Sequence, residues 1–244
     1  MRTPLSHPSK VVLTGGTSGI GAEMLELLLA EGHQVIVLAR RGSQLEPRIG
    51  LEAIDIDLGN AAAIMAVAAD IAMRHPDISI IINNAALQYP IALTDPDFDP
   101  GQMVAEVSVN LLAPALLIHA LLPVLRRHDA GAAIVNVSSG LAFFPKQQSA
   151  LYCATKAALH SFSQSLRYQL EQDGAAVIEA ILPIVETPMT AGRGSGKMSA
   201  HDAAQAIVAG IKKGRAEIFI GKAKLIPLFA RFAPAIGRQI LRGT

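Results

Sequence analysis

Short runs of valine and isoleucine alternate with longer amphipathic stretches along most of the chain. Continuous apolar runs bounded by turn residues are typical of strands buried on both faces, whereas apolar residues three and four positions apart indicate helices. The runs predict strands at 11–13, 35–38, 51–56, 78–82, 134–137, 177–181 and 217–220. The helical pattern falls between them, at 20–31, 61–74, 102–127, 152–172 and 201–213. This alternation predicts an α/β fold with one doubly wound parallel sheet of about seven strands and helices on both faces.

The size and composition of the chain fit a single domain over 1–244. Its 244 residues are 51% hydrophobic, which is enough for one core. A net charge of +1 gives no overall field to attract nucleic acid or a membrane surface, so we expect neither partner. The lone Cys153 excludes an internal disulfide, and the polar start lacks the apolar segment of a secretion signal. We therefore expect a cytoplasmic protein, with the apolar run at 109–125 as a core helix rather than a membrane span.

Glycines cluster where the first predicted strand ends and the first helix begins, in the segment TGGTSGIG. Such a turn lets the backbone approach a pyrophosphate, which the helix N-terminus then stabilises. A tight turn without a ligand would use the same glycines, but the position in the first strand–helix unit favours a Rossmann-like dinucleotide pocket. The expected cofactor-binding residues of this turn are Gly15, Thr17, Ser18, Gly19, Ile20 and Gly21.

The end of the second predicted strand indicates which dinucleotide binds. Ala39 stands where a carboxylate would hold the ribose hydroxyls of NAD, and Arg40 and Arg41 follow it. Two guanidinium groups can bind a 2′-phosphate through charge-assisted hydrogen bonds, although surface arginines are often only solvated. The absence of an acidic residue at this position favours NADP over NAD, so the expected cofactor is NADP(H).

Tyr152 and Lys156 stand four positions apart in the segment ALYCATK. On a helix this spacing places both on one face, so the ammonium can lie near the phenol. A nearby positive charge favours the phenolate and lowers a tyrosine pKa of about 10, which makes Tyr152 a candidate general acid and base. Pairs with this spacing also occur by chance, as a packed aromatic beside a solvated amine.

Five motifs follow one another along the chain: TGGTSGIG (14–21), NNAA (83–86), VNLL (109–112), IVNVSSG (134–140) and YCATK (152–156). In this order they resemble the short-chain dehydrogenase/reductase family, over about residues 10 to 220. Within the family, LTGGTSGIG, NNAALQ and ETPM are most similar to the bacterial group labelled DltE-like.

The resemblance implies a role for each catalytic residue. Tyr152 would exchange a proton with the substrate oxygen, while Lys156 would also hold the nicotinamide ribose. Ser139, thirteen residues before Tyr152, would hydrogen-bond the substrate carbonyl, with Ser138 as the alternative. Asn110 would anchor a water relay behind Lys156, or would instead be a satisfied amide in a kinked helix.

The resemblance also extends the cofactor site. Asp57, with Leu58 beside it, would face the adenine, and Asp55 is the alternative if the strand register differs. Asn84 and Ala85 would lie against the adenosine ribose, and Thr187 would donate to the phosphates or to the nicotinamide amide. Ala86 and Pro183 depart from the family pattern, which places the pose of the cofactor in question rather than the catalysis.

The segments 141–148 and 188–200 are the expected walls of the substrate pocket, and we expect the second to be mobile. Their Phe143, Phe144, Lys146, Arg193 and Lys197 suit an apolar substrate with an acidic group, but the charges are also explained by solvated loops. The histidines show no ligand spacing, so we expect no metal site and regard His160 as a helix-packing residue. For the tail at 225–244 we favour packing against its own chain or a second subunit over contact with a membrane.

The predicted function is NADP(H)-dependent interconversion of a small-molecule carbonyl and an alcohol. A catalytically weak, NADP-binding redox-sensing module is the alternative. An epimerase or dehydratase of nucleotide sugars is less favoured, because few residues follow the sixth strand. The resemblance further implies a homodimer or homotetramer assembled through the helices at 102–127 and 152–172.

Overall fold

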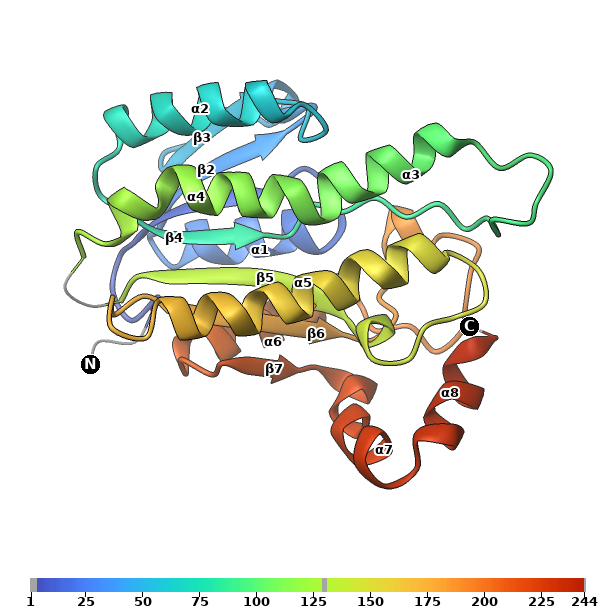
Figure 1. The fold of residues 1–244 in the computed structure, drawn as a ribbon. Helices are drawn as coiled ribbons and strands as arrows, with labels where there is room; N and C mark the ends of the chain where they lie inside the picture. Colours follow the sequence, from blue (N-terminus) through green and yellow to red (C-terminus); the bar gives the residue numbers. More distant parts are fainter. Residues whose placement is uncertain (1–3, 129–130, 244) are drawn as a thin grey trace.

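The computed structural model describes residues 4–128 and 131–243, and within them seven parallel strands form one sheet (Figure 1). Their order across the sheet is β3-β2-β1-β4-β5-β6-β7. The strands are β1 (Lys10–Thr14), β2 (Gln34–Ala39), β3 (Leu51–Asp55), β4 (Ile78–Asn83), β5 (Ala133–Ser139), β6 (Ala176–Leu182) and β7 (Glu217–Phe219). The predicted doubly wound, Rossmann-like sheet is therefore confirmed, and each strand lies within about two residues of its expected range.

Helices cover both faces of the sheet (Figure 1). They are α1 (Gly19–Ala30), α2 (Ala61–Arg74), α3 (Pro100–Val107), α4 (Ala113–Leu125), α5 (Ala150–Gln169), α6 (Ala200–Lys212), α7 (Ile226–Phe232) and α8 (Pro234–Arg242). Side-chain caps begin several of them: the Asn60 side chain accepts a hydrogen bond from the Ala63 N–H, and the Ser199 side chain accepts one from the Asp202 N–H.

Successive side chains of each strand point to opposite faces of the sheet and therefore belong to two separate hydrophobic cores. Val11 and Leu13 of β1 point to one face, where they pack with α1 and α6. Val12 points to the other face, where the core is completed by α2, α4 and α5. Because both faces are covered, the strands carry continuous apolar runs, which is why they could be read from the sequence.

The long apolar helix is continuous but changes its winding. Between α3 and α4 the segment Ser108–Leu112 forms a π-helical turn, a feature often found at functional sites. The whole stretch Pro100–Leu125 is long and apolar enough to cross a membrane by length and composition. Here Leu117 and Leu121 are buried against α2 and the sheet, as expected for a core helix.

The C-terminal tail forms a hairpin of two short helices, α7 and α8, beyond β7 (Figure 1). Ile226, Phe229 and Leu241 pack with Phe144 in a third, smaller apolar cluster. The Gln147 N–H donates to the Arg242 carbonyl oxygen at 2.9 Å. The tail therefore packs against its own chain, as favoured from the sequence.

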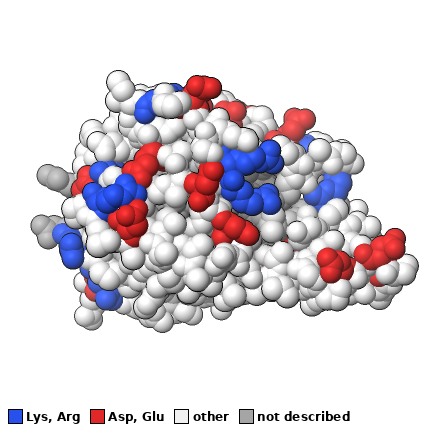
Figure 2. All heavy atoms as spheres, turned by 90° about the horizontal axis from the view of Figure 1, so that it is seen from above, with Lys and Arg blue, Asp and Glu red and all other residues white. Residues whose placement is uncertain are grey.

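Figure 2 shows lysines and arginines interspersed with aspartates and glutamates over one face of the molecule. No broad area of this face carries a single sign, in agreement with the net charge of +1.

Candidate active site

A large cavity, of about 1330 Å³, lies at the carboxyl ends of the strands. Its walls run from the glycine turn after β1 to the tail helices α7 and α8. The chain changes direction between β1 and β4, which lie side by side although β2 and β3 intervene in the sequence. Crevices at this topological switch point are where open α/β sheets bind their ligands.

The glycine turn opens the cavity and is fixed by the adjacent strand end. Gly15 has a φ of +71°, a left-handed conformation that favours glycine. A side chain at Gly21 would overlap the Gly15 carbonyl oxygen, so only glycine allows this close turn. Behind it, the Thr14 Oγ1 accepts hydrogen bonds from the N–H groups of Asn84 and Ala85, each at 3.0 Å. Thr17, Ser18, Gly19 and Ile20 line the cavity with these glycines.

The side chain of Asn84 serves the turn itself. Its Nδ2 donates to the carbonyl oxygens of Thr14 at 3.0 Å and Gly15 at 3.2 Å. Asn84, Ala85 and Ala86 all line the cavity. The amide thus holds the turn in shape, and the expected ribose contact of this segment stays a prediction.

Arg40 and Arg41 follow β2 at one end of the cavity. Both line it, both are exposed, and neither forms an ion pair with any carboxylate that the structure describes. Asp57 and Leu58 line the same end. Asp55, the alternative to Asp57, faces elsewhere, because its carboxylate accepts from the N–H and hydroxyl of Ser43 at 2.7 Å each.

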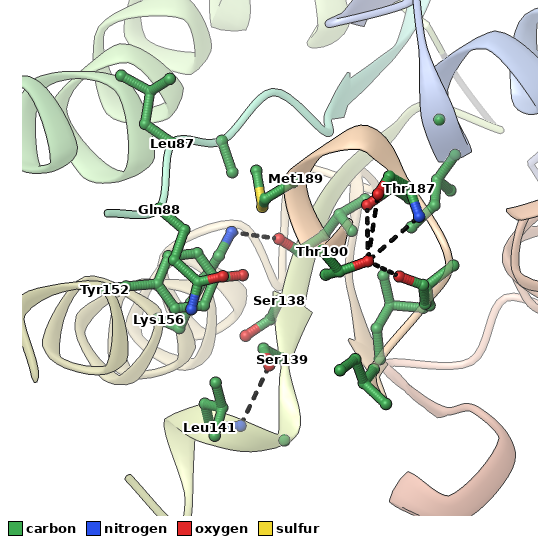
Figure 3. Close-up of a pocket in the computed structure, with 18 of the residues that line it drawn as sticks. Leu87, Gln88, Ser138, Ser139, Leu141, Tyr152, Lys156, Thr187, Met189 and Thr190 are labelled. Carbon is green, nitrogen blue, oxygen red and sulfur yellow. Dashed lines mark hydrogen bonds between the residues drawn. The ribbon is translucent and has the colours of Figure 1, made fainter. Parts of the chain in front are cut away.

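Ser139, Tyr152 and Lys156 come together in one wall of the cavity (Figure 3). Ser139 ends β5, and the other two project from α5, which packs against that strand. The Lys156 Nζ lies 5.6 Å from the centre of the Tyr152 ring and donates to the Val137 carbonyl oxygen at 2.9 Å. The Ser139 Oγ accepts from the Leu141 N–H at 3.2 Å. The four-residue spacing therefore brings the phenol and the ammonium to the same side of α5.

Burial sets the protonation of this pair. It raises the pKa of the Tyr152 phenol, and the neighbouring Cys153 and Glu106 raise it further, while Arg193 and the Ser139 hydroxyl oppose the shift. From the sequence we expected Lys156 to lower the pKa of Tyr152, and this direction was wrong. The physical reason is that the phenol is almost fully withdrawn from water. Burial also lowers the pKa of Lys156 to about 8, against the charge of Glu179.

Ser138 also lines the cavity, with a buried Oγ that has no hydrogen-bond partner among the described residues. It therefore remains a second hydroxyl at the strand end. The influence of the Ser139 hydroxyl on the pKa of the Tyr152 phenol favours Ser139 for contact with a substrate oxygen.

Asn110 lies behind the site, in the π-helical turn. Its Oδ1 accepts from the Leu87 N–H at 2.7 Å, and its Nδ2 donates to the Leu87 carbonyl at 2.8 Å and the Thr155 hydroxyl at 3.2 Å. The amide is thereby satisfied, and it ties the segment after β4 to α5. The water relay stays a prediction.

The segment after β6 forms the opposite wall, where Thr187, Met189 and Thr190 lie (Figure 3). Thr187 and Thr190 bond to each other at the start of a short 3-10 turn, so the Thr187 side chain is held in place. Pro183 lines the cavity as well. The following loop is tied down by the Met198 N–H, which donates to the Ile184 carbonyl at 3.1 Å.

Two expected pocket residues lie outside the cavity wall. Phe143 packs on His160, with ring centres 4.6 Å apart, and on Phe219. Lys197 donates to the Thr190 carbonyl at 2.7 Å and braces the loop from outside. Phe144, Lys146 and Arg193 do line the cavity.

The tail also supplies residues of the cavity wall, which we did not predict from the sequence. The cavity is closed at the end away from Arg40 and Arg41 by Ile226, Phe229, Ile240 and Leu241. The spacing of Ile226 and Phe229, and of Gly237 and Leu241, is that of the inward face of a helix, and this signal could have identified them.

The structure also brings together three residues that are distant in sequence: His160, Glu179 and Glu217, whose donor atoms lie within 4.8 Å of one another. The His160 Nδ1 and the Glu179 Oε2 are 2.6 Å apart, the length of a hydrogen bond rather than the separation of two ligands on one ion. His160 is therefore more than a packing residue, since it pairs with a fully buried carboxylate.

A glycine turn at the switch point of a parallel sheet, facing a tyrosine–lysine pair, defines a dinucleotide-binding α/β protein with an acid–base centre. The family model for short chain dehydrogenases matches residues 9–197. The chain belongs to the short-chain dehydrogenase/reductase family.

Among its relatives is DltE of Bacillus subtilis (strain 168), an uncharacterised oxidoreductase that is 35% identical over 224 residues, covering 85% of this chain and 86% of DltE. A short chain dehydrogenase from Burkholderia cenocepacia J2315, solved in complex with NADP, superposes with a TM-score of 0.87. It is 27% identical, with 98% of this chain and 99% of that chain covered. The inactive hydroxysteroid dehydrogenase-like protein 1 of Homo sapiens is 29% identical over 189 residues, covering 74% of this chain and 57% of that protein.

Proposed function

We propose that the protein is an NADP(H)-dependent oxidoreductase that interconverts a carbonyl and an alcohol, with Tyr152 as the general acid and base. The observation that carries this proposal is the convergence of Tyr152, Lys156 and Ser139 in the same cavity as the glycine turn. A relative solved with NADP supports the choice of a nicotinamide cofactor.

The residues at the cavity wall suit this cofactor. The turn at Gly15 and Gly21 is so close that a side chain at either position would press on neighbouring atoms of the protein, and the turn lies beside the N-terminus of α1. Arg40 and Arg41 offer guanidinium groups that pair with no described carboxylate, as a 2′-phosphate requires. Asp57 stands at the same end, where it would meet the adenine.

When bound, a reduced nicotinamide supplies a hydride to the substrate carbonyl carbon. The protein's own residues handle the oxygen and its proton. Ser139 donates a hydrogen bond to the carbonyl oxygen and stabilises its growing negative charge. Tyr152 gives the proton of its hydroxyl to that oxygen, and Lys156 stabilises the phenolate that remains.

The protonation of the pair favours reduction. Burial raises the pKa of Tyr152, so the phenol keeps its proton at neutral pH and can donate it. The alkoxide formed from a carbonyl is a much stronger base than a phenolate, so this transfer runs downhill. The pKa of Lys156, about 8, leaves the ammonium largely charged at neutral pH.

The decisive experiment supplies deuterium-labelled NADPH or NADH with a panel of aldehydes, ketones and quinones. We expect deuterium at the carbinol carbon of at least one alcohol product, with NADPH preferred. The alternative is a redox-sensing module, and one relative of the chain is an inactive dehydrogenase-like protein. Such a module would bind NADPH but would transfer deuterium to no product.

We further propose that the protein assembles as a homodimer or homotetramer through α3, α4 and α5. Val104, Leu112 and Tyr168 of these helical segments are 68%, 48% and 75% exposed, which leaves apolar surface for a second copy. Sedimentation velocity tests this, and a monomer at micromolar concentration would contradict it.

A further inference from the structure

Positive side chains outnumber negative ones in the cavity wall. The lysines and arginines that line it are Arg40, Arg41, Lys146, Lys156, Arg193, Lys222 and Arg242. Among the lining residues that the structure describes, Asp57 is the single carboxylate, and it lies at the adenosine end. A cavity with this balance selects anionic ligands.

The proposed function accounts for only part of this charge. Arg40 and Arg41 would face the 2′-phosphate, and Lys156 acts with Tyr152. Lys146, Arg193, Lys222 and Arg242 are left. Of these four, Lys146 and Arg193 belong to the segments expected to form the substrate pocket. Lys146 lies between β5 and α5, and Arg193 lies in the loop opposite.

Lys146 and Arg193 lie close enough to influence each other and the catalytic tyrosine. Burial lowers the pKa of Lys146, and the positive charge of Arg193 lowers it further. The same Arg193 charge opposes the upward shift of the Tyr152 pKa that burial causes. Both cations are partly buried, and neither pairs with any carboxylate in residues 4–128 or 131–243. Two unpaired like charges at one place cost free energy unless an anion joins them.

The loop holds Arg193 toward the cavity. Its Nη2 donates to the Met189 carbonyl oxygen, and Met189 itself lines the cavity. A solvated arginine would need no such anchor, since its guanidinium would move freely in water. The planar guanidinium keeps further N–H groups for a bidentate acceptor.

The substrate end also carries apolar side chains. Phe144 is 4% exposed and faces Ile226, Phe229 and Leu241 of the tail. These side chains provide a surface for a hydrocarbon or aromatic body. The cavity therefore offers an apolar wall and a pair of cations together with the Tyr152 hydroxyl.

We propose that Lys146 and Arg193 form a subsite for an anionic group of the substrate, carried by an apolar body that packs against the tail. The carbonyl to be reduced then lies between that body and Tyr152. The proposal rests on the proposed function and narrows its substrate to carbonyl compounds with a carboxylate or a similar anion.

The experiment compares two acids, para-formylbenzoate and a medium-chain ω-oxo fatty acid, with their methyl esters. Each pair shares its apolar body and differs in charge, so the ratio of kcat/KM for acid over ester isolates the anionic group. We expect a ratio of about ten to a hundred, the value of a charge-assisted hydrogen bond. In a Lys146→Gln/Arg193→Gln double variant the ratio should fall to about one.

Lys224→Gln is the matched control, because Lys224 is exposed on the neighbouring segment and does not line the cavity. It should keep the wild-type ratio. A wild-type ratio near one, or a double variant that keeps the wild-type ratio, would overturn the subsite and leave the proposed function standing.

A binding measurement separates the subsite from the chemistry. Calorimetric titration with para-(hydroxymethyl)benzoate and its methyl ester, in the presence of NADP, needs no turnover. If no aldehyde is reduced but the acid binds more tightly than the ester, the proposed function fails and the subsite stands. Equal binding of acid and ester would contradict the subsite.

Discussion

Arg40 and Arg41 lie next to each other after β2, where a strand end meets the cavity. A role in binding a 2′-phosphate could be proposed from the sequence, because the ribose-binding position is local to the strand–helix unit and holds Ala39 instead of an acid. The sequence could not show whether their guanidinium groups form ion pairs with carboxylates. Ion-pair partners can come from any part of the chain, and the structure shows none for either arginine among the described residues.

Arg40→Ala should therefore weaken NADPH binding by about ten- to a hundredfold, because a charge-assisted hydrogen bond to the 2′-phosphate is lost. NADH lacks that phosphate and should bind nearly as before. Fluorescence titration of both cofactors measures the difference. Arg48→Ala is the control, since Arg48 pairs with Glu26 outside the cavity. Equal losses for NADPH and NADH would refute the assignment.

For Tyr152 and Lys156, the sequence predicts their shared position on the helix but not the pKa of the phenol. Their shared face follows from four-residue helical spacing, which is a local property. The direction of the Tyr152 pKa shift depends on how completely the cavity wall covers the phenol, and no local pattern encodes that cover. The sequence therefore placed the pair correctly and gave the wrong direction for the pKa of the phenol.

At the scale of elements, strands and helices were predictable because each carries its own periodicity and caps. The neighbours across the sheet were not. Glu179 of β6 is in register with Glu217 of β7, and His160 of α5 lies next to both. His160 and Glu179 are 19 positions apart, and Glu217 lies further along the chain, so the topology brings the three residues together. One Glu179 oxygen is buried without a partner, within range of the Lys156 charge.

Glu179→Gln should shift the pH profile of reduction. Burial lowers the pKa of Lys156 to about 8, and the Glu179 charge partly opposes this. Removing that charge lowers the pKa further, so the ammonium is lost at a lower pH. The fall of kcat/KM on the alkaline side should move to lower pH by a measurable amount. Glu217→Gln, at the neighbouring carboxylate, is the control, and identical profiles for wild type and Glu179→Gln would disprove the coupling.

At the scale of the whole molecule, the tail was the least predictable part. It forms two short helices, and their position depends on contacts with Phe144 and Ile181, far back in the chain. In the resulting fold α7 and α8 close the substrate end of the cavity, while the glycine turn forms the cofactor end. One cavity thus joins segments from both ends of the sequence.

Gly237 marks how closely the tail packs. A β-carbon at this position would lie 2.6 Å from the Phe144 ring. Gly237→Val should lower the free energy of unfolding by about 1–3 kcal/mol, as overpacking of a filled site does. Urea unfolding followed by circular dichroism measures this. Gly243→Val is the control, because nothing lies within 4 Å of a β-carbon there. A similar stability for both variants would show that the tail is loosely held.

The most direct test of the whole account is single-turnover oxidation of bound NADPH by a reducible carbonyl, in wild type and in Tyr152→Phe. The substitution removes the hydroxyl and keeps the buried ring. NADPH binding should be retained while the rate of oxidation falls by about a hundred- to ten-thousandfold, the usual contribution of a general acid. A rate equal to that of the wild type would contradict the assignment of Tyr152 as the proton donor.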